Sequence, residues 1–212
     1  ADELDEITAV YAEKAKAGLR LAVGFNRRFS PHFVKAKEFL GERRNPLVMT
    51  YRVNAGALPA DHWTQDPAVG GGRIIGEGCH FVDYLQALSG GRVVSVHAAA
   101  IGEHGSGIVE DQAILSLRFS DGSVGTVVYA AGGDTALAKE RCEVFGDGKS
   151  IVMDDFARSE FFGGGKRTAR MPSKSMPGAL GSRSAAQKAC IWAEKPLSRA
   201  PVLNAVRLPP PK

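Results

Sequence analysis

The 212-residue sequence contains no apolar run that approaches the roughly 18 residues of a membrane-spanning helix. Its first residues, Ala1-Asp2-Glu3-Leu4, are acidic, whereas a signal peptide has a basic segment followed by an apolar one. Cysteine is scarce: the three cysteines at positions 79, 142 and 190 are an odd number and have no Cys-x-x-Cys spacing. This pattern disfavours a disulfide framework or a zinc clip and predicts a protein of the reducing cytoplasm.

A basic surface is also missing from most of the chain. The formal net charge is +4, but six lysines or arginines and one glutamate lie in residues 176–212, whereas residues 1–175 hold 21 basic and 22 acidic residues. The positive charge therefore belongs to the C-terminal part, and the rest lacks the footprint of a nucleic-acid-binding domain. The hydrophobic share of 44% is ordinary, so the length and composition indicate one globular domain, with room for an appendage.

Residues 70–83 form the stretch around which the rest of the sequence is organised. It begins with three glycines, which a fold keeps where the backbone needs unusual angles or a close approach to something. From Gly76 onward the pattern is helical, and residues 89–91 end it. Four apolar residues at i, i+3, i+4 and i+7 predict the buried face of this helix: Phe81, Tyr84, Leu85 and Leu88.

Titratable residues lie on the same helix beside the apolar face. His80 and Asp83 are close enough to meet, and Glu77 lies one turn before His80. Histidine titrates near neutral pH, so His80 is a candidate proton acceptor; a buried histidine held by Asp83 or a backbone carbonyl is the alternative. Glu77 is either a partner of His80 or a first-turn acid that complements the helix dipole. Cys79 is interpreted as a packed apolar residue, and no metal site is expected because adjacent helix positions point apart.

The hydrophobic pattern predicts an α+β fold. Apolar residues at helical spacing in 4–15 predict a helix, and the apolar run 21–25 predicts a strand buried on both faces. Ser30-Pro31 predicts the start of a second helix. After the central helix the period changes to two, and Asp121-Gly122 and Asp147-Gly148 predict hairpin turns. Strands are predicted at 47–53, 93–98, 114–119, 124–129, 143–145, 150–152 and 161–171.

These elements predict a mostly antiparallel open sheet with helices on one face. Residues 1–25 contain one helix and one strand, which cannot form a sheet alone. We interpret them as the last αβ unit of a Rossmann domain whose earlier part is missing. Residues 26–172 form the α+β domain, and residues 173–212 form a basic, proline-rich tail. An open sheet face predicts a homo-oligomer.

Several motifs together resemble the Gfo/Idh/MocA family of NAD(P)-dependent oxidoreductases, over roughly residues 1–172. The motifs are Asn-Arg-Arg-Phe at 26–29, His62-Trp63 followed by Asp66-Pro67, the octapeptide Gly-Gly-Gly-Arg-Ile-Ile-Gly-Glu at 70–77, and Gly78, His80 and Asp83 in the pattern Gly-x-His-x-x-Asp. Members of this family join an N-terminal Rossmann domain to a C-terminal α+β domain with a large, mostly antiparallel sheet.

The resemblance implies a substrate-binding and oligomerisation domain of an oxidoreductase that acts on a sugar, cyclitol or related hydroxy compound. It implies His80 as the group that takes the hydroxyl proton while hydride leaves the same carbon. It implies NAD or NADP in the whole protein and none bound to this fragment, which we expect to be inactive alone. The implied substrate-binding residues are Arg27, Arg28, His62, Trp63, Arg73, Glu77 and Asp83, and the implied cofactor-binding residues are Gly71 and Gly72.

Each of these assignments has a structural alternative. Arg27 and Arg28 could bind a carboxylate in a bidentate manner or form ion pairs at an interdomain seam. Arg73 could hold an anion or lie on a loop surface. His62 and Trp63 could form a wall for sugar stacking or anchor their loop. Asp83 could orient His80 or cap local structure.

The sequence departs from the family in three ways. It lacks the fingerprint Gly-x-Gly-x-x-Gly, so this chain cannot bind the cofactor phosphates in the usual manner. Gly76 occupies the position, four residues before His80, at which many members have an aspartate. The catalytic Glu-Lys-Pro of the family is expected before residue 1, although Glu194-Lys195-Pro196 occurs in the tail. A catalytically silent scaffold or dimerisation module is therefore the alternative function.

Overall fold

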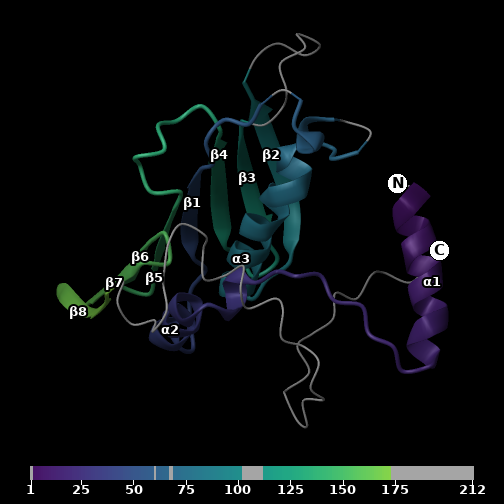
Figure 1. The fold of residues 1–212 in the computed structure, drawn as a ribbon. Coiled ribbons are helices and arrows are strands. Elements are labelled where there is room, and N and C mark those ends of the chain that lie inside the picture. The colour runs from purple at the N-terminus through teal and green to yellow at the C-terminus, as the bar shows by residue number, and fades with distance from the viewer. Residues whose placement is uncertain (1, 60, 67–68, 102–111, 173–212) are drawn as a thin grey trace.

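The computed structural model describes residues 2–59, 61–66, 69–101 and 112–172, which build one open sheet with helices on one face (Figure 1). The described part contains eight strands in the order β2-β3-β4-β1-β5-β6-β7-β8. The β1–β4 pair is parallel, and the other neighbouring pairs are antiparallel. The predicted α+β class with a mostly antiparallel open sheet is therefore confirmed.

The strands are β1 (Val48–Asn54), β2 (Val93–Ala100), β3 (Ala113–Phe119), β4 (Val124–Ala130), β5 (Glu140–Gly146), β6 (Lys149–Asp154), β7 (Arg158–Gly163) and β8 (Lys166–Met171). The α-helices are α1 (Asp2–Lys16), α2 (Pro31–Leu40) and α3 (Cys79–Ser89). Short 3-10 turns occur at η1 (Arg27–Phe29) and η2 (Trp63–Gln65), and a π-helical turn, η3 (Ile74–Gly78), leads directly into α3.

Strand β1 lies in the middle of the sheet and joins its two halves. On one side β4 pairs with it in parallel, and on the other side β5 pairs with it antiparallel. A parallel pair needs a crossover connection, and the chain between β1 and β4 supplies one that carries α3. This topology places α3 across β1 and β4, so the helix that carries His80 is held over the centre of the sheet.

The two hairpins recognised in the sequence also anchor the segment before β1. Gly122, Asp147 and Gly148 have positive φ, as their tight turns require. The carboxylate of Asp121 accepts a 3.0 Å hydrogen bond from Arg43, and that of Asp147 accepts a 2.8 Å bond from the backbone N–H of Arg44. The turn residues therefore fix β1 between the two halves of the sheet.

Helices α2 and α3 pack on the same face of the sheet, α3 over β1 and β4 and α2 over β6 and β7. Ser30 caps α2 by accepting the backbone N–H of Phe33 at 3.1 Å, as its sequence predicts. Gly90 ends α3 in the left-handed conformation at φ 80°. The apolar face predicted for α3 is fully buried, and its residues Phe81, Tyr84, Leu85 and Leu88 form the core together with Tyr51 and Tyr129 of the sheet.

The single strand predicted over 161–171 is wrong, because the structure has two strands there. Gly164 and Gly165 have positive φ and form a tight turn between β7 and β8. The hairpin between β6 and β7 was not recognised in the sequence. Its turn uses Asp155 and Phe156 at positive φ, where glycine or asparagine is the usual signal.

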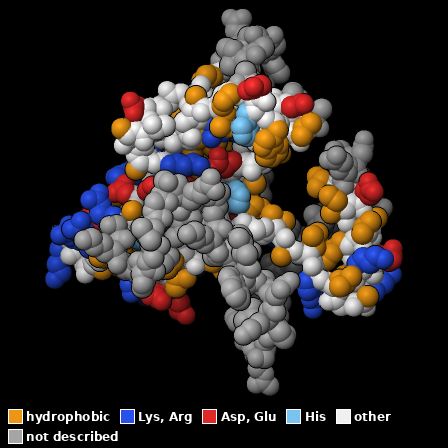
Figure 2. All heavy atoms as spheres, viewed as in Figure 1, with side chains coloured by type: hydrophobic (Ala, Val, Ile, Leu, Met, Phe, Trp, Pro, Cys, Tyr) orange, Lys and Arg blue, Asp and Glu red, His pale blue; other side chains and the backbone are white. Residues whose placement is uncertain are grey.

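The strand predicted for residues 21–25 is also not formed. The described structure pairs no strand with this segment, and Leu21 and Val23 are exposed. A buried parallel strand needs neighbouring strands on both edges, and no strand of the described residues pairs with this segment. Helix α1 is confirmed, but its apolar side chains Leu4, Ile7 and Val10 are exposed, and it lies apart from the sheet (Figures 1 and 2).

The tail that begins at residue 173, with Cys190 and Glu194-Lys195-Pro196, lies outside the described residues. Among the residues that are described, no helix is both long enough and apolar enough to cross a membrane.

Candidate functional site

The glycine run positions the start of α3 by two different means. A Cβ on Gly70 would come within 2.4 Å of the Thr64 backbone, so the loop before the helix can close only over glycine. Gly71 and Gly72 have φ of 65° and 85°, backbone angles that residues with a Cβ atom rarely adopt. The prediction that these glycines serve unusual angles and a close approach is therefore confirmed.

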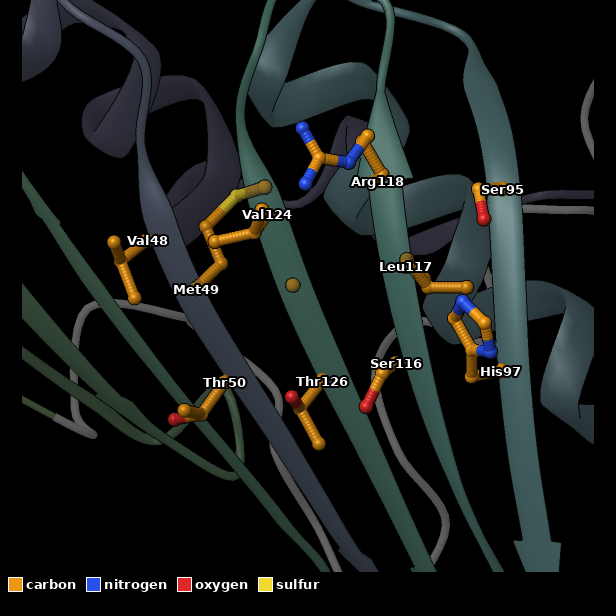
Figure 3. A pocket seen from close by; sticks show the side chains of 11 residues that line it. Val48, Met49, Thr50, Ser95, His97, Ser116, Leu117, Arg118, Val124 and Thr126 are labelled. Atoms are coloured by element: carbon orange, nitrogen blue, oxygen red, sulfur yellow. The ribbon is translucent and has the colours of Figure 1, made fainter.

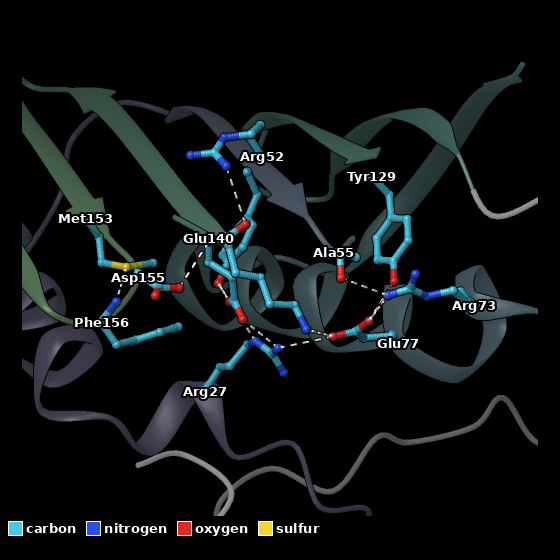
Figure 4. A network of polar contacts seen from close by, with 12 residues as sticks. Arg27, Arg52, Ala55, Arg73, Glu77, Tyr129, Glu140, Met153, Asp155 and Phe156 are labelled. Carbon is cyan, nitrogen blue, oxygen red and sulfur yellow. Dashed lines mark hydrogen bonds and ion pairs between the residues drawn. The ribbon is translucent and has the colours of Figure 1, made fainter. Parts of the chain in front are cut away.

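A π-helical turn connects this loop to α3 and directs Glu77 toward the sheet. Single π-turns occur frequently at functional sites. The Glu77 carboxylate accepts a 2.6 Å hydrogen bond from the Tyr129 hydroxyl and a 2.5 Å bond from Lys139 Nζ (Figure 4). Nη2 of Arg73 lies 3.6 Å from one of its oxygens, and Nη2 of Arg27 lies 3.9 Å from the other. Three cations and a phenol thus converge on one carboxylate.

This environment keeps Glu77 ionised. Burial alone would raise the pKa of Glu77, but the hydrogen bonds from Lys139 and Tyr129, together with the charges of Lys139 and Arg27, outweigh it and lower the pKa below its ordinary value. Glu77 is the acid in the first turn of η3, as one of its two predicted roles requires. Its hydrogen bonds go to β4 and to the residue before β5.

A second carboxylate, Glu140 at the start of β5, anchors the other side of the network. Arg27 donates two parallel hydrogen bonds to it, at 2.9 and 2.8 Å, and the Tyr51 hydroxyl donates a third at 2.5 Å. The Arg27 guanidinium also lies 4.6 Å from the centre of the Phe81 ring. Burial would lower the pKa of Arg27, but the bonds and charge of Glu140 outweigh it and raise the pKa. Arg27 is therefore part of the interior, tying η1 to β5.

Arg28 makes a similar pair with the helix. Its Nε donates to Asp83 at 2.8 Å, and its Nη2 donates to the other carboxylate oxygen. Asp83 is buried and Arg28 is partly exposed. Of the two roles considered for Asp83 from the sequence, orienting His80 or capping local structure, the contacts show a third: Asp83 joins α3 to η1.

His80 lies on the same helix beside these ion pairs. Its ring meets the Phe25 ring edge-on at a centroid distance of 5.5 Å, and its Nδ1 is buried without a hydrogen-bond partner among the described residues. Burial lowers the pKa of His80, and the Arg27 charge lowers it further, against the opposing carboxylates of Glu77, Asp83 and Glu140. The imidazole is therefore neutral near pH 7 and able to accept a proton. Gly76 opens to empty space, so no acid supports the ring from that position.

Four residues singled out in the sequence remain to be placed: Arg73, His62, Trp63 and Cys79. Arg73 belongs to it and donates a 2.5 Å bond to the Gly56 carbonyl. His62 caps η2 through its Nδ1 and contacts the Thr64 hydroxyl at 2.8 Å. Trp63 is exposed beside His62. Cys79 is also exposed and is not packed as the sequence predicted. Its thiol is still partly shielded from solvent, and this partial burial raises the pKa of Cys79.

Sequence reasoning missed Tyr51, Tyr129, Lys139 and Glu140. Tyr51 and Tyr129 occupy positions that the alternating strand pattern predicts to be buried, so the sequence indicates ordinary core residues there. Lys139 and Glu140 lie in a Lys-Glu-Arg run at the start of a strand, which resembles a solvated surface. A buried acid can be identified only when its cationic partner is known, and Arg27 is 113 residues away.

The described residues contain no cluster of three or more histidines, cysteines or acids that could hold a metal ion.

Comparison with known families gives a direct match. Residues 39–152 match the GFO/IDH/MocA C-terminal domain. The chain belongs to this family. The region that matches the GFO/IDH/MocA C-terminal domain contains β1, β4 and helix α3, which carries His80.

Individual relatives agree with this assignment. The uncharacterized oxidoreductase YrbE of Bacillus subtilis is 29% identical over 158 residues, which are 72% of this chain and 45% of the relative. An oxidoreductase domain protein from Kribbella flavida has a similar structure, with a TM-score of 0.65 at 21% identity over 84% of this chain and 57% of that chain. Levoglucosan dehydrogenase in complex with NADH and levoglucosan has a TM-score of 0.57 at 20% identity, covering 70% of this chain and 46% of that chain. The GFO/IDH/MocA domain described here thus spans about half of the length of these relatives, and the two solved structures share its fold.

Removing the Glu140 charge should destabilise the domain. Arg27 and Glu140 are 11% and 7% exposed, so a Glu140→Gln variant leaves a buried guanidinium without its counter-charge. We expect the free energy of unfolding, measured by urea titration, to fall by about 3–5 kcal/mol. The matched variant Glu143→Gln, whose carboxylate pairs with Arg141 at a more exposed site, should lose about 1 kcal/mol or less. Equal losses in the two variants would contradict a buried Arg27–Glu140 pair.

The pKa of His80 should be measurably low. Burial disfavours the charged imidazolium, so the pKa of His80 should lie below the ordinary histidine value of 6.5. A titration followed by histidine NMR resonances, with the His80 signal assigned from a His80→Gln variant, measures the midpoint. The unfolded chain binds this proton more readily than the folded chain does. The contribution of His80 to the free energy of unfolding should therefore be fully present above pH 6.5 and should decrease as the pH is lowered. A midpoint at or above 6.5 would show that the surrounding carboxylates dominate.

Proposed function

We propose that this chain is the substrate-binding and oligomerisation domain of an NAD(P)-dependent oxidoreductase that acts on a sugar, a cyclitol or a related hydroxy compound. Membership of the GFO/IDH/MocA C-terminal domain family supports the reaction class. The observation that carries the proposal is His80: a half-buried, neutral imidazole with an unpartnered Nδ1, fixed on the helix between two ion-pair networks. In such an enzyme His80 accepts the proton of the substrate hydroxyl.

The ion pairs give His80 a rigid setting without an acidic partner on the preceding turn. Arg27 with Glu140 and Arg28 with Asp83 hold η1, α3 and β5 together, so these arginines and Asp83 support the wall of the cleft. Arg73 and Glu77 lie deeper along the same wall. Trp63 is exposed and His62 lies against it, an arrangement that suits stacking on a sugar ring.

The cofactor would be NAD or NADP, bound mainly by a dinucleotide-binding domain. This chain has no Gly-x-Gly-x-x-Gly fingerprint, and we expect the isolated chain to hold no cofactor. Its own contribution is the glycine loop, because Gly72 and Gly76 have no neighbouring atoms within 4 Å of a Cβ position. We propose that a nicotinamide approaches the backbone at Gly71 and Gly72, with the open space at Gly72, since a Cβ on Gly71 would meet the Ile75 side chain at 3.4 Å. When bound, it would supply hydride transfer.

Residues 2–25 fit the proposal as the element that meets the dinucleotide-binding domain. Three residues of α1, Ile7, Val10 and Tyr11, line a hollow of about 300 Å³ together with Leu19 and Leu21. Residues 21–25 have the composition of a buried strand but no strand partner among the described residues. Docking against a parallel sheet would provide hydrogen bonds for the strand and cover the apolar side chains together.

Oligomerisation would use the face of the sheet opposite the helices. Figure 3 shows this face, with Ser95, His97, Ser116, Thr126 and Thr50 projecting beside a hollow of about 350 Å³. A row of apolar residues crosses neighbouring strands on the same face: Val124, Val48 and Phe145. All three are exposed. We therefore propose that a second copy of the chain covers this surface.

The free thiols of Cys79 and Cys142 agree with a reducing cytoplasm, which we propose as the location.

A catalytically silent scaffold is the second candidate function. Gly76, exposed where an acid would support His80, is the observation that favours it. The same open sheet would then serve assembly alone. The two functions differ in whether His80 affects turnover.

Replacing His80 tests the catalytic proposal. In a protein that contains this chain behind a dinucleotide-binding domain, His80→Ala should lower kcat by about 10²- to 10⁴-fold, because the proton acceptor is lost. The KM for the hydroxy substrate should change much less. Val34→Ala, at an exposed position of α2, is the control and should keep full turnover. An unchanged kcat in His80→Ala would instead support the scaffold.

The oligomer is tested by its mass. Light scattering of the chain at micromolar concentration should give a dimer or a larger assembly, and Thr126→Arg should shift it toward the monomer by placing a charge in the covered face. Val34→Arg, at an exposed position of α2, should leave the mass unchanged. A monomeric mass for the unaltered chain would refute the proposal.

A further inference from the structure

The charges around Glu77 do not balance. Arg27, Arg73 and Lys139 surround it, whereas the acids of the same network are Glu77 and Glu140. Arg27 divides its contacts between the two acids. The other contacts of Arg73 are with neutral groups: the carbonyls of Ala55 and Gly56 and the ring of Tyr129. The network therefore carries one positive charge more than its carboxylates neutralise.

The acidic and basic residues next to this network do not remove the surplus. Asp155 accepts the backbone N–H of Glu140 at 3.1 Å, and its pKa is raised, chiefly by burial. The charges of Lys139 and of Arg52, whose guanidinium donates to the Ala138 carbonyl, both act on Asp155 in the opposite direction. Counting Asp155 and Arg52 together adds one acid and one cation, so the surplus of one positive charge stays. Arg28 and Asp83 neutralise each other, and His80 is uncharged near pH 7.

The surplus charge reaches solvent through Lys139. Its side chain is 41% exposed, whereas that of Arg73 is 7% exposed and that of Arg27 is 11% exposed. Lys139 is thus the cation of the network that a ligand can touch, with Arg73 and Arg27 behind it. Glu77, its partner at 2.5 Å, keeps the Tyr129 hydroxyl and Arg73 when a ligand draws Lys139 away.

The backbone holds Lys139 in this place before any ligand binds. The end of β1 fixes the connection between β4 and β5: the Asn54 N–H donates to the Lys139 carbonyl at 2.7 Å, and the Asn54 side chain donates to the Asp134 and Leu137 carbonyls. A Cβ on Gly133 would come within 2.1 Å of the Asn54 side chain, so this connection closes tightly against β1. Preorganisation of this kind lowers the entropic cost of binding.

We propose that Lys139 binds an anionic group of the substrate, a carboxylate or a phosphate carried on a sugar-like compound. The inference rests on the proposed function and names the substrate class for the same proposed site. It also moves anion recognition away from Arg27 and Arg28, because carboxylates of the chain itself already occupy both guanidinium groups. The ammonium suits either anion, since it acts as a compact charge without the fixed fork of arginine.

Ligand binding to the full 212-residue chain tests the proposal, by calorimetry or by ligand-observed NMR. The probes are glucuronate for the carboxylate, glucose 6-phosphate for the phosphate and glucose as the neutral compound. At least one anionic sugar should bind about tenfold more tightly than glucose, the effect of one hydrogen bond to a charged group. The preference should shrink as sodium chloride is added, because Lys139 is partly exposed. Inorganic phosphate and acetate carry the anionic group without the sugar, so their affinities show how much the sugar part contributes to binding.

The variant Lys139→Gln should lose the preference for the anionic sugar, and Lys139→Arg should keep most of it. Lys166→Gln on β8 removes the same charge from another exposed lysine and should leave the preference intact. The proposal is overturned if glucose binds as tightly as both anionic sugars, if the chain binds neither anion, or if Lys139→Gln changes nothing. Binding of glucose without an anion preference would leave the proposed dehydrogenase function standing, since that function is tested through His80.

Discussion

The buried pair of Arg27 and Glu140 is the interaction on which the candidate site depends. It joins η1, which precedes α2, to the first residue of β5, and the same guanidinium lies on the Phe81 ring of α3. Three elements from distant parts of the chain therefore meet at one planar cation. Desolvating two charges is costly, and here the cost is offset by two parallel hydrogen bonds and a third from Tyr51. The position of α3, and so of His80, follows from this arrangement.

The chemistry of the candidate site follows from how charge is distributed around that pair. Carboxylates of the chain neutralise Arg27 and Arg28. Burial and the Arg27 charge keep His80 uncharged near pH 7, and Lys139 is the most exposed cation around Glu77. A neutral imidazole can accept a proton, and a partly exposed ammonium is the chemical group that the anion-binding proposal uses. In the described structure, the glycine loop before α3 leaves open space at Gly72 and Gly76, where a Cβ would have no neighbour within 4 Å. These features belong to a domain that spans about half the length of its relatives.

Much of the fold could be predicted because its signals are local. The apolar face of α3, the Ser30 cap and the Asp-Gly turns depend on residues within a few positions of one another, and all were found in the structure. Predictions failed where local signals mislead. The Asp155-Phe156 turn has no glycine, and residues 21–25 have strand composition without a neighbouring strand.

The sequence by itself determined the class of the sheet, the helix that carries His80, and the glycines at positive φ, because periodicity and backbone sterics act over short distances. Only the tertiary structure decided which charges meet. Arg27 finds Glu140 113 residues away, and Arg28 finds Asp83 55 residues away, so two arginines that could have served a ligand serve the fold. Lys139 reaches Glu77 62 residues away and remains partly exposed. Electrostatic roles depend on distance in space and on burial, which no spacing along the chain encodes.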